Sequence, residues 1–185
     1  ATKTARYVKQ LKGTAALVYD TRKTTPGLRV LEKYAVRVGG GRNHRMGLYD
    51  QVLVKDNHIA VLNTLGRNVF KELKEADRKA LPLVEVEVTT VEQAVEAVEA
   101  RADIIMLDNM TVEEMHEAVM AIGRRAAQLN MPVPDTEASG GVTIEQMSEI
   151  AATGVNRISV GGLTHSVRSV DISLEIARGE IEDGF

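Results

Sequence analysis

The sequence predicts a parallel α/β barrel that forms one domain. Three observations lead to this fold class: short apolar strands alternate with helical segments, nearly every strand ends in charged or glycine-bearing residues, and 185 residues allow one ordinary domain. With 44% hydrophobic and 26% charged residues, the composition is that of a globular, core-forming chain. An open doubly wound sheet is the alternative. The polar strand ends favour the barrel, because barrels gather their reactive groups at the carboxyl ends of the strands.

Six short apolar or β-branched runs are typical of buried strands, since each is bounded by polar or glycine-rich residues. These runs are Ala15–Tyr19, Gln51–Val54, Leu83–Val88, Ile104–Leu107, Pro132–Val133 and Val155–Val160. A seventh segment, Val170–Ile176, alternates apolar and polar residues and is expected to be a strand with one apolar face.

Helical patterns lie between most of these strands. Val91–Val98 has apolar residues at the i, i+3, i+4, i+7 spacing of an amphipathic helix, and Thr90 precedes it as an N-cap. Two capping-box patterns begin further helices, Thr111 with Glu114 and Thr143 with Gln146. The first eight residues look like a helix already in progress, which suggests a domain excised from a longer chain.

The composition excludes several classes of protein. The chain has no cysteine, which rules out disulfides, thiolate zinc sites and a cysteine nucleophile. An aromatic share of 3% without tryptophan leaves few platforms on which nucleic-acid bases could stack. No apolar run approaches the roughly 18 residues of a membrane span, and no signal-peptide pattern is present. We expect a cytoplasmic protein without nucleic-acid or membrane partners.

The net charge of −3 is the sum of two opposed parts. Residues 1–58 carry 12 Lys and Arg against 4 Asp and Glu, a net +8, while residues 59–185 carry 11 against 22, a net −11. Basic or hydrogen-bond-donating side chains occur at three places near the ends of the early strands. These are Arg22–Lys23 after the first strand, Asn43–Arg45 after the glycine run at 39–41, and Lys55 after the next strand. Any one of them could be a solvated loop charge. Together, without acidic neighbours, they predict a site for a polyanion, whose carboxylates or phosphates arginine can bind bidentately.

Two glycine turns and several carboxylates complete the candidate site. Ser139–Gly141 and Gly161–Gly162 follow consecutive late strands, where backbone N–H groups can approach a phosphate. Glu87, Asp108 and Glu137 follow three neighbouring strands. They could hold Mg²⁺ through water, bind sugar hydroxyls, or pair with the cations Arg22, Lys23 or Lys55. Glu85 shares the strand face of Glu87, and the sequence leaves open which of the two faces the site.

The four histidines differ in what they can do. His44 lies inside the basic cluster and could donate to a carboxylate or titrate. His58 and His165 follow loop residues, where a structural hydrogen bond is expected, and His116 lies on an exposed helix pattern. No pair of histidines has the spacing of metal ligands.

These motifs resemble the quinolinate phosphoribosyltransferase family, the decarboxylating enzymes of NAD biosynthesis. The resemblance covers the chain from end to end and is carried by DTRKTTPGLR at 20–29, GGGRNHRMGLYD at 39–50, KDNH at 55–58, EVEV at 85–88, LDN at 107–109, EASGG at 137–141 and GGLTHS at 161–166. It implies a TIM-like, incomplete barrel of six or seven strands, without the family's N-terminal α/β sandwich domain. Residues 1–170 would be the barrel, and residues 171–185 a strand and tail that pack on that other domain.

The resemblance also implies a reaction and roles. Quinolinate would receive the phosphoribosyl group of phosphoribosyl pyrophosphate and lose CO₂, giving nicotinate mononucleotide and pyrophosphate, with Mg²⁺ as cofactor. Lys23, Glu87 and Asp108 would be catalytic. Lys23 would lie near the reacting centre or the pyrophosphate, and the carboxylates of Glu87 and Asp108 would face the ribose hydroxyls and the water shell of Mg²⁺. The quinolinate ligands would be Arg22, His44, Arg45 and Lys55. The ribose and 5′-phosphate ligands would be Glu87, Asp108, Ser139, Gly140, Gly141, Gly161 and Gly162.

Family sites form across a homodimer, so the resemblance implies that this chain alone turns over poorly. Three alternatives stay open. One is a related phosphoribosyltransferase acting on another base, although four candidate cations suit a dicarboxylate better than a monocarboxylate. Another is a Schiff-base aldolase with Lys55 or Lys23 as the nucleophile. The third is a phosphate-binding barrel without turnover.

Overall fold

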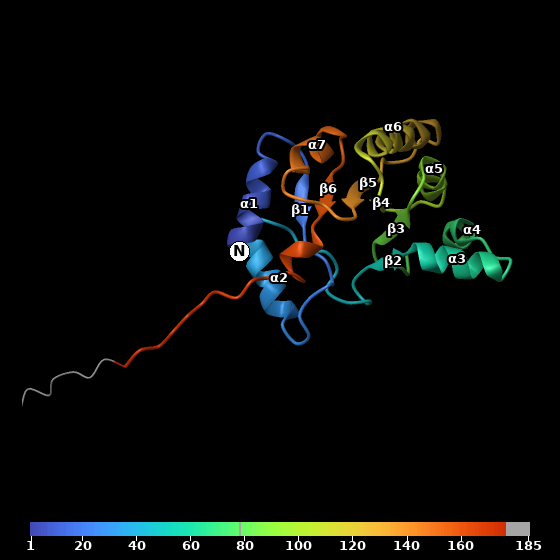
Figure 1. Cartoon of the computed structure of the whole chain (residues 1–185). Helices are drawn as coiled ribbons and strands as arrows, with labels where there is room; N and C mark the ends of the chain where they lie inside the picture. Colours follow the sequence, from blue (N-terminus) through green and yellow to red (C-terminus); the bar gives the residue numbers. More distant parts are fainter. Residues whose placement is uncertain (78, 177–185) are drawn as a thin grey trace, which may run out of the picture.

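Six parallel strands build the sheet of the computed structural model, which describes residues 1–77 and 79–176 (Figure 1). The strands are β1 Leu17–Tyr19, β2 Val52–Val54, β3 Val84–Val88, β4 Ile104–Asp108, β5 Asp135–Ser139 and β6 Arg157–Ser159. They pair in the order β1-β6-β5-β4-β3-β2, so β1 and β2 are edges that do not pair with each other. The predicted incomplete parallel α/β barrel is confirmed, with six strands in the part of the chain described.

The helices lie outside the sheet. They are α1 Thr2–Gln10, α2 Arg29–Val38, α3 Asp56–Thr64, α4 Val69–Glu75, α5 Val91–Glu99, α6 Val112–Gln128 and α7 Met147–Ala152, and a 3-10 turn, η1, spans Gly161–Leu163. Helices α1 and α7 lie beside β1 and β6, whereas α5 and α6 pack together next to β3 and β4 (Figure 1). Within the described ranges, no helix has the length and apolar character needed to cross a membrane.

The predicted helix caps are present with one difference. The Thr90 side chain accepts from the Gln93 backbone at the start of α5, and both bonds of the capping box at the start of α6 form. At the third site, Gln146 accepts from the Thr143 backbone at 3.1 Å, but α7 begins only at Met147. This box is therefore half formed, because a turn separates Thr143 from the helix.

Two strand expectations were wrong. Pro132–Val133 lies in a loop, since proline cannot donate to a strand ladder, and the strand begins at Asp135. This strand escaped prediction because its sequence, DTEAS, has no apolar run. Val170–Ile176 is exposed and pairs with no strand among residues 1–77 and 79–176, because it runs away from the sheet (Figure 1). The rest of the predicted tail, 177–185, lies outside the described residues.

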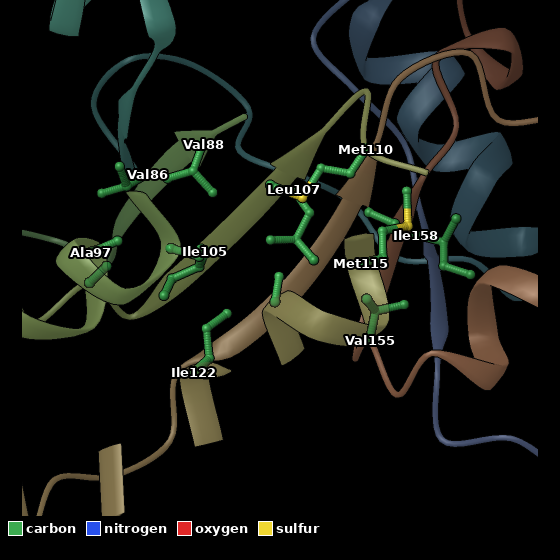
Figure 2. Packing of buried hydrophobic residues seen from close by; sticks show 14 of the residues in the cluster. Val86, Val88, Ala97, Ile105, Leu107, Met110, Met115, Ile122, Val155 and Ile158 are labelled. Atoms are coloured by element: carbon green, nitrogen blue, oxygen red, sulfur yellow. The ribbon is translucent and has the colours of Figure 1, made fainter. Parts of the chain in front are cut away.

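Successive side chains of a strand alternate between the apolar core on the helix side of the sheet and the barrel interior on the other side. Val86 and Val88 of β3, with Ile105 and Leu107 of β4, belong to the apolar core that packs against α5 and α6 (Figure 2). The residues between them face the other side of the sheet, which is the barrel interior. There the layer is polar: Glu85 of β3 and Glu137 of β5 are both fully buried. The interior therefore differs from the branched apolar layers usual in barrels.

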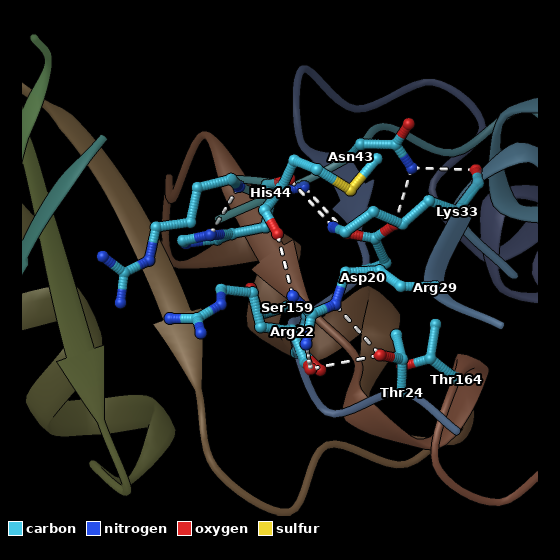
Figure 3. Close-up of polar contacts among 12 residues, drawn as sticks. Asp20, Arg22, Thr24, Arg29, Lys33, Asn43, His44, Ser159 and Thr164 are labelled. Carbon is cyan, nitrogen blue, oxygen red and sulfur yellow. Dashed lines mark hydrogen bonds and ion pairs between the residues drawn. The ribbon is translucent and has the colours of Figure 1, made fainter. Parts of the chain in front are cut away.

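A buried ion pair joins α2 to the end of β1. Lys33 is 1% exposed and Asp20 is fully buried, and Lys33 Nζ lies 2.5 Å from Asp20 Oδ1. Lys33 Nζ also donates to the His44 carbonyl at 2.9 Å, and Asn43 Nδ2 donates to Asp20 Oδ2 at 2.6 Å (Figure 3). One ion pair thus attaches the 43–44 loop to both β1 and α2.

Removal of the Lys33 charge should be severely destabilising. Lys33→Met leaves Asp20 as a buried, unpaired carboxylate, which is expected to lower the free energy of unfolding by about 3–5 kcal/mol in urea titrations. Arg37→Met is the matched control, because Arg37 is an exposed cation on the same helix, and its effect should stay within about 0.5 kcal/mol. Equal losses in the two variants would show that the pair has no special role.

Candidate functional site

A cavity of about 720 Å³ opens at the carboxyl ends of the strands. Its lining includes all twelve residues to which the family resemblance assigns a role, from every strand end and from the loop after α2. These twelve are Arg22, Lys23, His44, Arg45, Lys55, Glu87, Asp108, Ser139, Gly140, Gly141, Gly161 and Gly162. The structure brings them together, and the role of each stays a prediction.

Seven further lining residues were missed by the sequence analysis: Thr21, Leu53, Met106, Asn109, Val142, Ser159 and His165. Some of them could have been found from strand periodicity. Leu53 stands two residues before Lys55, and Met106 stands two before Asp108, so each shares a strand face with a predicted site residue. Leu53 and Met106 add apolar surface, which suits the flat ring of an aromatic substrate.

Two arginines at the cavity have no carboxylate partner. No ion pair within residues 1–77 and 79–176 involves Arg22, Lys23 or Arg45, and Arg22 Nε is buried without a hydrogen-bond partner there. Burial and the nearby charge of Arg22 lower the pKa of Arg45 from its ordinary value, against smaller opposing effects of Glu85 and Asp50. The Arg22 side chain points away from the Asp20–Lys33 pair (Figure 3). Close, uncompensated guanidinium groups favour the binding of an anion.

Arg29 of α2 donates hydrogen bonds to both of the loops that carry these arginines. Its guanidinium donates to the carbonyl of Arg22 at 3.2 Å and to the carbonyl of Met46 at 3.1 Å, and its Nε donates to Thr24 Oγ1 at 3.1 Å (Figure 3). Because one planar group holds both loops, Arg22 and the segment after Arg45 keep a fixed separation. No sequence pattern indicated this role for Arg29.

Glu87, and not Glu85, reaches the cavity. Glu87 is 6% exposed, and its Oε2 lies 2.6 Å from Lys55 Nζ. The prediction that Glu87 could form an ion pair with Lys55 is therefore confirmed. The Lys55 side chain is 45% exposed. An accessible ammonium held by a carboxylate is not the desolvated neutral amine that a Schiff-base mechanism needs, which argues against the aldolase alternative.

Gly140 and Asn109 set the position of Asp108. Asn109 has a φ of 54°, its Nδ2 donates to Asp108 Oδ2 at 2.6 Å, and its N–H donates to the Ser139 carbonyl at 3.0 Å. Gly140 has a φ of +102°, and a Cβ there would lie 2.2 Å from Asn109 Oδ1. A glycine is therefore required at this turn for both steric and conformational reasons.

The second glycine turn is tied to neighbouring elements. Thr164 Oγ1 donates to the Lys23 carbonyl at 2.7 Å, and Lys3 Nζ of α1 donates to the Gly162 carbonyl at 2.6 Å. A Cβ on Gly161 would lie 2.9 Å from His165 Nε2. The turn after β6 is thus held against Lys23, which brings the late glycine loop next to the early basic loop.

A second, buried cluster lies beneath the cavity. His44 Nε2 lies 2.9 Å from Glu85 Oε2 and 3.7 Å from Glu137 Oε1, and Ser159 Oγ donates to Glu137 Oε1. Burial, followed by the charge of Glu85, raises the pKa of Glu137 to about 7, against the opposing effects of His44 and Ser159. Glu137 does not line the cavity, so the expectation that it faces the ligand was wrong, because it lies in the middle of β5.

The other histidines have the expected surroundings. His58 Nδ1 accepts from the Lys55 backbone at 2.9 Å at the start of α3, and His116 is exposed on α6. His165 Nδ1 lies 2.7 Å from Ser166 Oγ, and its ring also lines the cavity. His58 and His116 therefore stay outside the candidate site.

Comparison with known proteins gives a consistent result. Residues 1–175 match the family model described as quinolinate phosphoribosyl transferase, C-terminal domain. The chain is 47% identical over 178 residues to a probable nicotinate-nucleotide pyrophosphorylase (carboxylating) of Bacillus subtilis strain 168, covering 95% of the chain and 57% of that protein. It is 43% identical over 169 residues to quinolinate phosphoribosyltransferase (decarboxylating) 2, mitochondrial, of Nicotiana glauca, covering 87% and 48%.

Solved structures are similar over the same region. The structure of NadC from Streptococcus pyogenes is 42% identical with a TM-score of 0.78, covering 94% of this chain and 57% of that one. The nicotinate-nucleotide pyrophosphorylase from Francisella tularensis is 38% identical with a TM-score of 0.79, covering 92% and 57%. The chain thus spans about half of the length of these proteins.

Substitution of Gly140 should disturb Asp108. Gly140→Ala places a methyl group against Asn109, and we expect it to cost at least about 1 kcal/mol more than Gly13→Ala in urea unfolding. Gly13 is the matched control, since it has a φ of +88° with nothing within 4 Å and so reports conformational strain alone. Equal losses would contradict a steric role of Asn109.

The Glu137 carboxyl should make stability depend on pH. Its folded pKa of about 7 lies above the ordinary value of 4.5, so the folded state holds this proton more tightly than the unfolded state does. That contribution is complete below about pH 4.5 and is lost as the pH rises to 7 and above. Relative to the wild type, Glu137→Gln should therefore gain stability between pH 5 and pH 8 in denaturant titrations. A difference that is the same at both pH values would contradict the assignment.

Proposed function

The chain belongs to the quinolinate phosphoribosyltransferase family, whose C-terminal domain it matches, and from this premise we propose that its protein transfers phosphoribose to quinolinate. In the proposed reaction the quinolinate nitrogen bonds to the anomeric carbon of phosphoribosyl pyrophosphate as the bond to pyrophosphate breaks. The 2-carboxylate then leaves as CO₂, and the ring carbon takes up a proton to give nicotinate mononucleotide.

The observation that carries this proposal is the pair of unpaired arginines, Arg22 and Arg45, at one cavity. Quinolinate has two adjacent carboxylates, and two guanidinium groups match that charge and its planar oxygen pairs. Lys55 lines the same cavity and adds a third cation, although Glu87 already balances part of its charge. An aromatic ring between these cations would lie against Leu53 and Met106.

The opposite wall of the cavity suits the phosphoribosyl group. Gly140, Gly141, Gly161 and Gly162 offer backbone N–H groups without side chains in the way, and Ser139 adds a hydroxyl, which together suit a 5′-phosphate. Glu87 and Asp108 provide acceptors for ribose hydroxyls. Lys23 lines the same cavity, and the bond from Thr164 to its carbonyl holds its loop against the turn after β6; its charge would face the pyrophosphate.

Catalysis would rest on placement and electrostatics. Both substrates carry several negative charges, so cations that hold them together reduce their repulsion and the entropic cost of their encounter. Positive charge develops on the anomeric carbon as pyrophosphate departs, and the carboxylates of Glu87 and Asp108 would stabilise it. Once the ring nitrogen is cationic, it stabilises the electron pair left by the departing CO₂. No covalent bond to the protein is required.

Four expectations remain parts of the proposal. Mg²⁺ would bind with the pyrophosphate and neutralise it, held through water by Glu87 and Asp108; these hard carboxylate oxygens fit the ion, and hydrogen bonds to Lys55 and Asn109 already orient them. A homodimer is supported by the exposed apolar side chains Val30, Leu31 and Tyr34 of α2. The isolated chain would turn over poorly, and the absence of cysteine supports a cytoplasmic location.

Loss of Arg45 should weaken quinolinate binding. Arg45→Ala removes a charged hydrogen-bond donor worth about 1.5–3 kcal/mol, so calorimetry on the whole protein should give a Kd at least about tenfold higher. Arg42→Ala is the control, because Arg42 is an exposed cation of the same loop that does not line the cavity, and its Kd should be unchanged. Unchanged affinity in Arg45→Ala would remove Arg45 from the site.

A further inference from the structure

We propose that Glu85, a buried carboxylate outside the substrate cavity, is a positioning residue that fixes the direction of Arg45 through His44 on one side and Gln51 on the other. The inference rests on the proposed function in one respect, which is that Arg45 binds a substrate carboxylate. Glu85 lies on β3 two residues before Glu87, is fully buried, and has no contact with the cavity.

The four residues form a closed circuit of polar contacts. The Arg45 backbone N–H donates to His44 Nδ1 at 2.8 Å, and the Arg45 guanidinium donates through Nη1 to the Gln51 carbonyl at 3.0 Å. Gln51 Nε2 then donates to Glu85 Oε2 at 2.5 Å, and the same oxygen lies 2.9 Å from His44 Nε2. Both the backbone and the guanidinium end of Arg45 are therefore tied to one carboxylate oxygen.

The contacts of His44 define its tautomer. Nδ1 accepts from a backbone N–H and so carries no proton, which leaves the ring proton on Nε2, the nitrogen that lies 2.9 Å from Glu85 Oε2. Burial lowers the pKa of His44, but the hydrogen bond and charge of Glu85 together with the charge of Glu137 outweigh it, so the pKa is raised from its ordinary value. A second ring proton would nonetheless break the bond from Arg45, so we assign the neutral form. Since Nδ1 is engaged by the Arg45 backbone and Nε2 lies beside Glu85, we expect His44 to act on the substrate through Arg45; its ring also lines the cavity, so the direct carboxylate contact expected from the sequence stays a prediction.

Arg45 needs such an anchor because of its neighbours. Arg22 carries the same charge, lines the same cavity and lowers the pKa of Arg45, so the two guanidinium groups repel each other when no anion lies between them. Arg45 is only partly buried and could turn toward water. The single Nη1 bond to the Gln51 carbonyl opposes that turn, and Glu85 holds Gln51 in place.

Burial of the Glu85 carboxylate without partners would cost free energy, so its burial needs an explanation. A positioning role explains it better than a metal site does. His44, Glu85 and Glu137 offer ligand atoms within 4.8 Å of one another, a spacing that could hold an ion. However, His44 Nδ1 already accepts from the Arg45 backbone, Nε2 then carries the ring proton, and the Gln51 amide and the Ser159 hydroxyl already donate to the two carboxyl groups, although Glu85 Oε1 and Glu137 Oε2 have no partner within the described residues. The donors that surround the carboxylates are suited to position side chains and would oppose a cation.

Quinolinate titrations of the whole protein test the proposal. Glu85→Met keeps the side-chain volume but removes the acceptor, so quinolinate should bind at least about tenfold more weakly. Glu85→Gln keeps an acceptor oxygen at the same place, so it should restore affinity to within about threefold of the wild type. Glu137→Met is the matched control, since Glu137 is as buried as Glu85 but has no bond to Gln51 or Arg45, and it should also stay within about threefold.

The proposal is overturned if Glu85→Met binds quinolinate as the wild type does, or if Glu137→Met loses as much affinity as Glu85→Met. Should Glu85→Met fail to fold, Gln51→Met interrupts the same circuit while it keeps the carbonyl that accepts from Arg45, and the same two outcomes apply. Thermal unfolding of each variant separates loss of affinity from loss of fold.

Nitrogen NMR of the four histidine rings distinguishes this proposal from the proposed function. The His44 signals, assigned by their loss in His44→Asn, should show a protonated Nε2 and an unprotonated Nδ1 in the wild type without ligand. A doubly protonated ring, or a proton on Nδ1, would overturn the circuit even if quinolinate binds. If the predicted tautomer is found but the wild type does not bind quinolinate, the proposed function fails while the circuit stands.

Discussion

Asp20 and Lys33 form an ion pair that is almost completely removed from water, and the segments that carry the cavity cations are attached to it. Asp20 also accepts from the backbone of His44 and the side chain of Asn43, and Lys33 donates to the His44 carbonyl. A buried pair with such additional hydrogen bonds has a defined geometry, whereas one with a missing partner is strongly unfavourable. The position of Arg45, one residue further along, follows from this constraint.

The basic character of the first 58 residues has two separate causes. Some cations are structural: Lys33 is paired with Asp20, and Arg29 is bonded to loop carbonyls. These cations stiffen the loops around the cavity. Arg22 and Arg45 remain without a carboxylate partner in the described ranges and supply the positive field that a dianionic substrate would neutralise. The excess positive charge of the first 58 residues thus comes partly from cations that hold the loops in place and partly from cations that face the cavity.

Much of the fold could be predicted because β3 has apolar residues at alternate positions, β4 is a continuous apolar run, and α5 and α6 have clear caps. The strand β5 could not, because its polar residues are buried only where neighbouring strands supply partners such as Ser159. Lys33 was missed for a similar reason, since lysine is rarely buried without a partner, and that partner, Asp20, is 13 residues away. The predicted site residues do share one cavity, because the ends of parallel strands meet at one edge.

The most direct test of the central claim is the affinity of the whole protein for a dicarboxylate relative to a monocarboxylate of the same ring. Calorimetric titrations with quinolinate and with nicotinate, under identical salt and pH, compare the two. If Arg22 and Arg45 bind adjacent carboxylates, quinolinate should bind at least about tenfold more tightly, because a charged hydrogen-bonded contact is lost with nicotinate. Equal affinities would contradict the account.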